Sequence, residues 1–349
     1  MAKRKQKKSV PSTAEAVAKQ KKERSLPWIL ISVAMLAVVI CVIAGFFIYR
    51  NNSGDLSATD PSYQGISPDV SGSKTTTMRI VKAGTAYLTK DTNSGTVFTF
   101  RRGDKVEVVE MDKDWATIAV EGRGYYLPKE MVRGADEFVI VLDAGHQLHE
   151  DIGKEAIGPG GQETEQKMDV GNTGVYTGQQ EYDVTMTICE KLKNELESRG
   201  FTVYLTRSNS GTNSSYKERA EVANKLNADA YLTIHNGYSS DPEVRGLGAI
   251  CSSSTNSYVS GLYDESKKLC SLLLISAAHT TGSKKLDVQE NDKLSGINWC
   301  NVPMAMLELG YLSNENDDRL LTSENYLGKL VEGLADGLGH YFYPTTDAK

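Results

Sequence analysis

The stretch FVIVLDAGH, residues Phe138 to His146, decides the fold predicted for this chain. Its first five residues, 138–142, are apolar, and a short run of this kind is typical of a buried strand. Asp143, Ala144 and Gly145 end the run, and His146 follows them. Open α/β sheets bind their ligands just beyond the carboxyl ends of their strands. The stretch therefore predicts a sheet strand with His146 at the ligand-binding edge.

Two later apolar runs also end in a residue that can bind a metal. Residues 229–234, DAYLTI, precede His235, and residues 303–307, PMAML, precede Glu308. If the three strands lie parallel in one sheet, two imidazoles and one carboxylate meet at one edge. Such a set of side chains can bind the metal ion of a metal-dependent hydrolase.

The region 137–344 alternates strand and helix patterns, which predicts an α/β domain with a central, mostly parallel sheet flanked by helices. A helix begins at Glu181, and its apolar residues recur every four positions until Gly200. Ser214 or Ser215 can cap a second helix. Residues 262–278 and 327–338 predict two more helices, and residues 201–206 and 248–251 predict strands. The long glycine-rich segment 147–180 is predicted to be a loop that is either functional or disordered.

The chemistry of zinc selects four residues. A catalytic zinc site uses three protein ligands from His, Cys, Asp or Glu and keeps one position for water. His146 and His235 fit as imidazole ligands, and the first turn of its helix can bring Glu181 to the same edge. We therefore predict a Zn²⁺ site formed by these three residues. Glu308 is then the predicted general base, which takes a proton from the attacking water and gives it to the leaving amine.

Each of these residues also has a structural interpretation. A single His after a strand often has a structural role, and an acidic residue such as Glu181 favours a helix N-terminus through the helix dipole. An Arg or Lys can neutralise Glu308 as well as a metal can. His149 is close enough in sequence to compete with His146 as a ligand. The occurrence of all three strand-end residues together favours the metal site.

The N-terminal region predicts a membrane anchor. Residues 1–24 contain nine Lys or Arg and two Glu, a net charge of +7, whereas the whole chain has −6, which leaves about −13 for the rest. The basic tail, residues 1–25, is followed by an uncharged apolar run within residues 26–49, long enough to span about 30 Å as a helix. The positive-inside rule keeps the tail in the cytoplasm and places the catalytic domain outside the cell. Residues 50–76 are predicted to be a flexible linker.

Residues 77–134 contain five short β-rich runs separated by turns. The pieces RRGDKVEVVE and DWATIAVEGRGYYLPKEMV resemble a bacterial SH3-like domain. The resemblance implies a small β-barrel that binds cell-wall peptides. A barrel that serves only as a spacer is the alternative, since a fold alone does not fix a function.

Four motifs between residues 138 and 343 resemble the zinc-dependent N-acetylmuramoyl-L-alanine amidases of the type 3 family. They are DAGH, EYDVTMTICEKLKNELESRGFTVYLTR, RAEVANKLNADAYLTIHNG and VPMAMLELGYLSN, in that order. The resemblance implies His146, Glu181 and His235 as zinc ligands and Glu308 as the catalytic residue. It also implies peptidoglycan as the substrate, cut at the amide between N-acetylmuramic acid and L-alanine of the stem peptide.

Two departures from that family pattern leave alternatives open. Asn236-Gly237 stands where the family usually has Ala-Asn, and the segment 147–180 is longer than the common form. The first departure favours a non-catalytic cell-wall-binding or recruiting protein with a degenerate amidase domain. A zinc peptidase that cuts within the stem peptide is a third interpretation. The acidic body of the chain argues against nucleic acid as a partner.

Five cysteines without a CxxC pair argue against a thiolate metal cluster. Of the four beyond residue 50, we expect buried free thiols, with one or two disulfides as the alternative. Trp299 is either a platform for sugar or peptide or a core residue.

Overall fold

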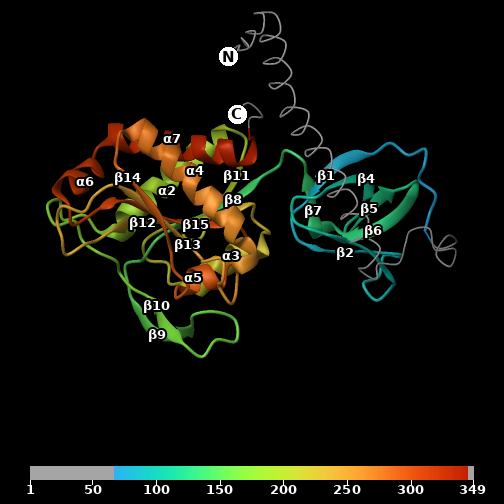
Figure 1. Ribbon diagram of the computed structural model, residues 1–349, viewed down its shortest axis with the longest axis horizontal. Coiled ribbons are helices and arrows are strands. Elements are labelled where there is room, and N and C mark those ends of the chain that lie inside the picture. The colour runs from blue at the N-terminus through green and yellow to red at the C-terminus, as the bar shows by residue number, and fades with distance from the viewer. Residues whose placement is uncertain (1–66, 345–349) are drawn as a thin grey trace, which may run out of the picture.

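The computed structural model describes residues 67–344, and they form two parts that lie side by side (Figure 1). The first is a seven-stranded antiparallel sheet in the order β3-β2-β6-β5-β4-β1-β7, called the β domain below. Its strands are β1 (Thr76–Ile80), β2 (Gly84–Tyr87), β3 (Thr96–Phe100), β4 (Lys105–Met111), β5 (Trp115–Val120), β6 (Arg123–Pro128) and β7 (Val132–Gly134), with a 3₁₀ turn η1 (Lys129–Met131) before β7.

The β domain has a core of its own. Val106 and Val108 of β4 point inward with Ile118 of β5 and Leu127 of β6, while the residues between them face water. The five predicted runs all coincide with strands, and β2 and β7 are two strands that the sequence did not predict. Both are short and carry almost no alternation of apolar and polar residues, which is the signal such a prediction needs.

The second part, called the α/β domain below, is built on a six-stranded sheet in the order β11-β8-β12-β15-β13-β14. All neighbouring strands are parallel except β13 and β15, so the prediction of a mostly parallel sheet is confirmed. The strands are β8 (Val139–Ala144), β11 (Thr202–Leu205), β12 (Ala230–Gly237), β13 (Leu247–Cys251), β14 (Lys285–Glu290) and β15 (Met304–Tyr311). β8, β12 and β15 adjoin one another at its centre.

Helices cover both faces of this sheet. The large core lies under α2 (Glu181–Ser198), α4 (Tyr263–Thr281) and α7 (Glu324–Phe342), and a smaller core lies under α3 (Tyr216–Lys225) and α5 (Ser295–Asn298). The short α6 (Glu315–Leu320) follows β15, and the 3₁₀ turn η2 (Ser260–Leu262) leads into α4. Because side chains alternate along a strand, Thr233 and His235 of β12 face the α3 side while Leu232 and Ile234 face the large core.

The helices begin and pack as the sequence indicates. The predicted face of α2 is fully buried, with Ile188, Leu192 and Leu196 inaccessible to water. Ser215 is the N-cap of α3 and forms a capping box with Glu218.

α4 and α7 pack so closely that a Cβ on Gly333 or Gly337 of α7 would lie 2.7–2.8 Å from the α4 backbone. Glycine is therefore required at both positions for the two helices to approach this far.

The segment 147–180 is not the loop that the sequence predicted. It contains a two-stranded antiparallel sheet, β9 (Asp151–Ala156) and β10 (Thr164–Met168), which projects from the lower side of the α/β domain in Figure 1. The strands carry few apolar residues because one face of the hairpin is exposed, so they gave no periodic signal. The turn Gly158-Pro159-Gly160-Gly161 was the one local sign of a hairpin.

The two domains meet at the amino ends of the central strands. Asp229, next to the start of β12, is 1% exposed and forms ion pairs with Arg79, Arg102 and Arg133 of the β domain, at 2.6, 3.2 and 2.6 Å. Phe138 lies under the Arg79 guanidinium, 4.6 Å from ring centroid to Cζ. This cluster, the Asp229 joint, lies at the opposite end of β12 from His235.

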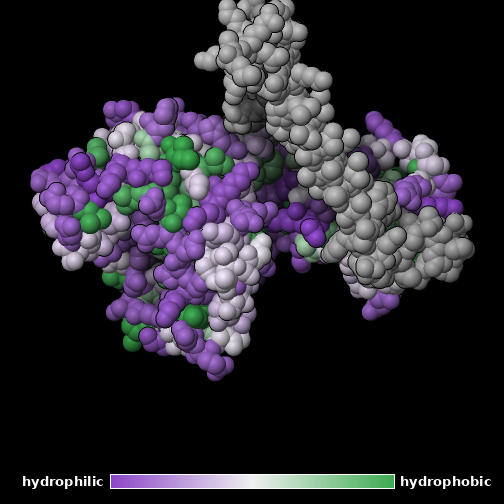
Figure 2. Space-filling model, viewed as in Figure 1, coloured by the Kyte–Doolittle hydropathy of each residue, from purple (hydrophilic) through white to green (hydrophobic). Residues whose placement is uncertain are grey.

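The predicted linker, residues 50–76, ends earlier than the sequence indicated. Residues 67–75 belong to the β domain rather than to a flexible segment, because Val70 donates to the Gly122 carbonyl and Pro68 accepts from the Gly124 amide. The predicted basic tail and membrane helix lie outside the described residues. Within residues 67–344, no helix has both the length and the apolar character needed to cross a bilayer. The face shown in Figure 2 is mainly hydrophilic, with apolar residues in small scattered groups, as water-facing surfaces usually are.

Candidate metal centre

His146 is fixed by an unusual backbone turn after β8. It has a positive φ of 61°, a conformation that non-glycine residues rarely adopt and that tends to occur at functional sites. Gly145 before it cannot carry a side chain, since a Cβ there would lie 2.5 Å from the His235 ring. The two histidines are thus brought together by the close approach of one strand end to the next.

Two buried arginines hold this turn in place. Arg207 donates to the carbonyls of Ala144 and Gly145, and Arg219 donates to those of Ala144 and His146. Arg219 also pairs with Asp143 at 3.1 Å, and both side chains are nearly inaccessible to water. The sequence did not indicate these arginines, because neither a cation on a predicted helix, such as Arg219, nor one just after a predicted strand, such as Arg207, shows which groups it will contact.

His146, Glu181 and His235 converge on one point. The Nε2 of His146 lies 3.0 Å from the Nδ1 of His235 and 3.0 Å from Glu181 Oε1, and His235 Nδ1 lies 3.4 Å from the same oxygen. All three side chains are buried, and their ligand atoms lie within 4.8 Å of one another. The predicted ligand set is therefore brought together from β8, α2 and β12.

Glu308 lies beside these three residues. It pairs in register with His235 on the neighbouring strand, so both side chains are on the same face of the sheet. Its Oε2 is buried and has no hydrogen-bond partner. Burial raises the pKa of Glu308 to about 7, because it opposes the charged form and the nearby histidines only partly offset this.

The electrostatics of the cluster favour a cation. Burial alone lowers the pKa of His146, but the carboxylates of Asp169 and Glu181 outweigh it and raise that pKa to about 10. For Glu181, burial opposes ionisation, yet the two imidazoles hold its pKa well below the usual range. A site that retains a proton this strongly stabilises positive charge.

The donor set fits a zinc ion. Two imidazole nitrogens and one carboxylate oxygen are a known catalytic ligand set for zinc, whereas calcium and magnesium prefer oxygen alone. Two ring nitrogens 3.0 Å apart form a triangle with a carboxylate oxygen that is 3.0 and 3.4 Å from them, which is an arrangement typical of metal ligands. The unpartnered Glu308 Oε2 is available to a water at the same place.

Asn236 and Gly237, where the chain departs from the family pattern, support the site. The Asn236 amide donates to Glu181 Oε1 at 3.0 Å, and its side chain donates to the Leu309 carbonyl. A Cβ on Gly237 would lie 2.7 Å from the Tyr311 ring. The departure therefore leaves the ligand geometry intact.

The remaining candidates from the sequence have other roles. His149 is exposed and is not among the clustered ligands. Trp299 is partly buried, donates from Nε1 to the Ala156 carbonyl at 2.8 Å, and lies under the Lys217 ammonium at 4.0 Å, so it packs as part of the smaller core. The four described cysteines are buried and free, which confirms the expectation of unpaired thiols for them.

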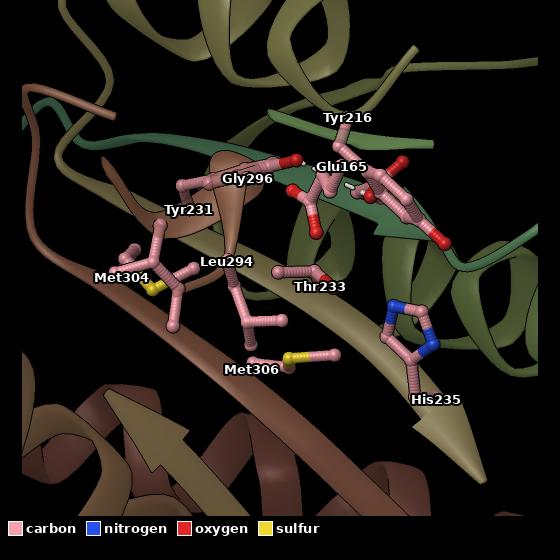
Figure 3. A pocket seen from close by; sticks show the side chains of 11 residues that line it. Glu165, Tyr216, Tyr231, Thr233, His235, Leu294, Gly296, Met304 and Met306 are labelled. Carbon is pink, nitrogen blue, oxygen red and sulfur yellow. Dashed lines mark hydrogen bonds between the residues drawn. The ribbon is translucent and has the colours of Figure 1, made fainter. Parts of the chain in front are cut away.

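A cavity opens next to His235 between the sheet and the α3 side (Figure 3). Met304, Met306 and Leu294 supply apolar walls, and Glu165 and Tyr216 supply polar groups. A small and mainly apolar cavity therefore lies directly beside the metal centre.

The chain is similar in sequence to known amidases. A family model described as N-acetylmuramoyl-L-alanine amidase matches residues 140–340. The protein named probable cell wall amidase LytH, from Staphylococcus aureus, is 29% identical over 165 residues, which cover 46% of this chain and 50% of LytH. The chain thus matches about half the length of such curated relatives.

Solved structures show the same fold. The N-acetylmuramyl-L-alanine amidase Ami1 of Mycobacterium abscessus superposes with a TM-score of 0.53 at 21% identity, covering 58% of this chain and 98% of that one. Ami1 of Mycobacterium smegmatis gives 0.53 at 22% identity, with coverage of 59% and 96%. Because the family model spans more than half of the sequence, the chain belongs to the N-acetylmuramoyl-L-alanine amidase family, Amidase_3.

Proposed function

We propose that this protein is a zinc-dependent peptidoglycan hydrolase that cleaves the amide between N-acetylmuramic acid and L-alanine of the stem peptide. The observation that carries the proposal is the convergence of His146, Glu181 and His235 on one point with Glu308 beside them. Membership of the family supplies the substrate class.

Three of the residues would bind zinc, and the fourth transfers protons. His146, Glu181 and His235 would hold the zinc ion, which when bound acts as a Lewis acid that polarises the scissile carbonyl and lowers the pKa of water. Glu308 accepts the proton of the attacking water and returns it to the leaving amine nitrogen. Burial raises the pKa of this carboxyl to about 7, and a bound cation nearby would favour its ionised form, which is the form that accepts a proton.

The cavity beside His235 supports the substrate assignment. Its apolar walls, Met304 and Met306 among them, suit a small apolar side chain close to the scissile bond. The methyl group of the alanine next to that bond is of this kind.

We also propose a location and a domain arrangement. The apolar run within residues 26–49 and the basic tail before it support a single membrane-spanning helix, with a cytoplasmic N-terminus and an extracellular catalytic domain. The β domain, residues 67–134, would be SH3-like and contact the cell wall. Residues 50–66 would link it to the membrane, and residues 137–344 form the catalytic unit.

A mass measurement tests the enzymatic proposal. The full-length chain, in detergent and with zinc added, is incubated with muropeptides, and intact stem peptides are expected among the products. Shortened stem peptides would instead show a peptidase. Binding to peptidoglycan without any release, by a folded and zinc-loaded protein, would contradict hydrolysis and favour the non-catalytic binding protein.

A further inference from the structure

The β9–β10 hairpin is docked onto the α/β domain at several points. Glu155 of β9 accepts hydrogen bonds from the Lys217 amide and the Ser295 hydroxyl, and Glu165 of β10 accepts from the Ser295 amide. The Ala156 carbonyl accepts from the Trp299 indole. Met168, at the end of β10, is fully buried. The chain that leaves this hairpin therefore starts from a fixed position.

That outgoing chain runs directly over the metal centre. Asp169 forms an ion pair with the Nδ1 of His146, on the opposite side of the ring from the nitrogen that faces Glu181 and His235. The other oxygen of Asp169 accepts from the Tyr216 hydroxyl at 3.2 Å. The carboxylate is thus held between a metal ligand and helix α3.

Three residues later the same chain reaches the second ligand. The amide of Asn172 donates to Glu181 Oε2 at 2.9 Å, and its side-chain amide donates to the same oxygen at 3.2 Å. These contacts leave Oε1 to face the histidines. Between them, Gly171 has a φ of 72°, and a Cβ there would lie 2.7 Å from the His146 ring and 2.8 Å from Glu181 Oε2.

Contacts of this kind orient the side chains that bind a metal. A histidine that binds a metal through one nitrogen carries its proton on the other, and an acceptor there fixes the tautomer and the ring orientation. A carboxylate ligand similarly needs a donor on its second oxygen to select which oxygen faces the metal. Asp169, whose carboxylate lies at ion-pair distance from His146 Nδ1, and Asn172, which donates to Glu181 Oε2, stand at these two places within four consecutive residues.

We propose that residues 169–172 form an outer clamp of the metal centre, in which Asp169 positions His146 and Asn172 positions Glu181. The inserted hairpin thereby determines how tightly the site binds zinc. This inference rests on the proposed metal site but not on the proposed hydrolysis.

The test is zinc affinity, measured on the full-length protein by competition with a chromophoric chelator. Outer partners of this type are worth about 10–100-fold in metal affinity. Asp169→Ala is expected to weaken binding by that factor, and Asp169→Asn, which keeps an acceptor but loses the charge, by less. Asn172→Ala removes one of two donors to Glu181 Oε2 and is expected to have the smallest effect.

Glu163→Gln is the matched control. Glu163 is exposed in the turn of the same hairpin, and this change removes one negative charge, as Asp169→Asn does. Its zinc affinity should stay within about twofold of wild type. The melting temperature of each zinc-free variant checks the fold, and since the Asp169 side chain is 54% exposed, its replacement leaves no cavity in the core.

The outcomes separate the two proposals. Wild-type zinc affinity in Asp169→Ala would overturn the clamp even if the enzyme is active. Weakened zinc binding in the Asp169 series, together with a zinc-loaded wild type that releases no stem peptide, would support the clamp and contradict the hydrolase. A wild-type protein that binds no zinc would overturn both.

Discussion

The two ends of β12 each hold a buried carboxylate among nitrogen-bearing side chains, yet they do different work. At the amino end, Asp229 pairs with three guanidinium groups and also accepts the Val139 amide. At the carboxyl end, Glu181 meets two imidazoles. Both carboxylates have only 1% of the side chain exposed, so burial does not distinguish them.

The difference lies in the partner. A guanidinium keeps its proton under all ordinary conditions and offers no lone pair, so the Asp229 joint is a permanent ion cluster. An imidazole can lose a proton and offer a lone pair to a metal. The adjacent Glu308 adds a buried carboxylate that can accept a proton beside these imidazoles. The groups at one end hold two domains together, whereas those at the other end are able to bind a metal and transfer protons.

The largest effect is expected on activity, when the carboxylate of Glu308 near the carboxyl end of β12 is removed. Glu308→Gln keeps the shape but cannot transfer a proton, so we expect the rate of stem-peptide release to fall by about 10²–10⁴-fold. Zinc affinity should be nearly unchanged, because Glu308 is not a ligand. A variant that keeps more than a tenth of the wild-type rate would remove Glu308 from the mechanism.

Removing the charge of Asp229 should instead act on stability. Asp229→Asn leaves three buried arginines without their counterion, and breaking such a cluster costs about 3–5 kcal/mol in the free energy of unfolding. Chemical denaturation measures this, with Asp112→Asn as control. Asp112 pairs with Lys90 in the β domain, but both side chains are 40% or more exposed, so that change should lower the free energy of unfolding far less than Asp229→Asn does. Equal losses in the two variants would contradict the structural role of the joint.

The pH dependence of stability should also distinguish the carboxyl end of β12, where Glu308 lies, from the Asp229 joint at the amino end. Burial raises the pKa of Glu308 to about 7 in the folded protein, so ionising it disfavours folding. In zinc-free protein, the stability of wild type relative to Glu308→Gln should therefore fall by roughly 3 kcal/mol as the pH rises from about 4 to 8, then level off. Denaturation curves across that range test this, and a difference that does not change with pH would show that Glu308 is not buried as described.

The smallest effect is expected when the joint keeps its charge. Arg133→Lys retains a cation near Asp229 but loses the second donor, which bonds the Leu226 carbonyl at 3.0 Å. We expect a loss of about 1 kcal/mol in the free energy of unfolding. A loss as large as that of Asp229→Asn would mean that the geometry of the guanidinium, rather than its charge, maintains the joint.

The sequence predicted the parts of this molecule that carry a periodic signal. The run before His146, the four-residue spacing in α2 and the strand ahead of His235 indicated both the sheet and the predicted ligands. Asp169, Asn172 and the hairpin before them carry no such period, because their role depends on contacts with residues that are distant in the sequence. Asp229 looked like an ordinary acidic residue, since its three partners belong to another domain.

The position of the Asp229 joint fixes the distance between the β domain and the metal centre. Six residues of extended chain separate Asp229 from His235, which amounts to about 20 Å along β12. If the β domain binds the cell wall as proposed, a polymer held near the joint would have to extend at least that far before one of its bonds reached Glu308. The central strand would then set the distance between the wall-binding surface and the site of hydrolysis.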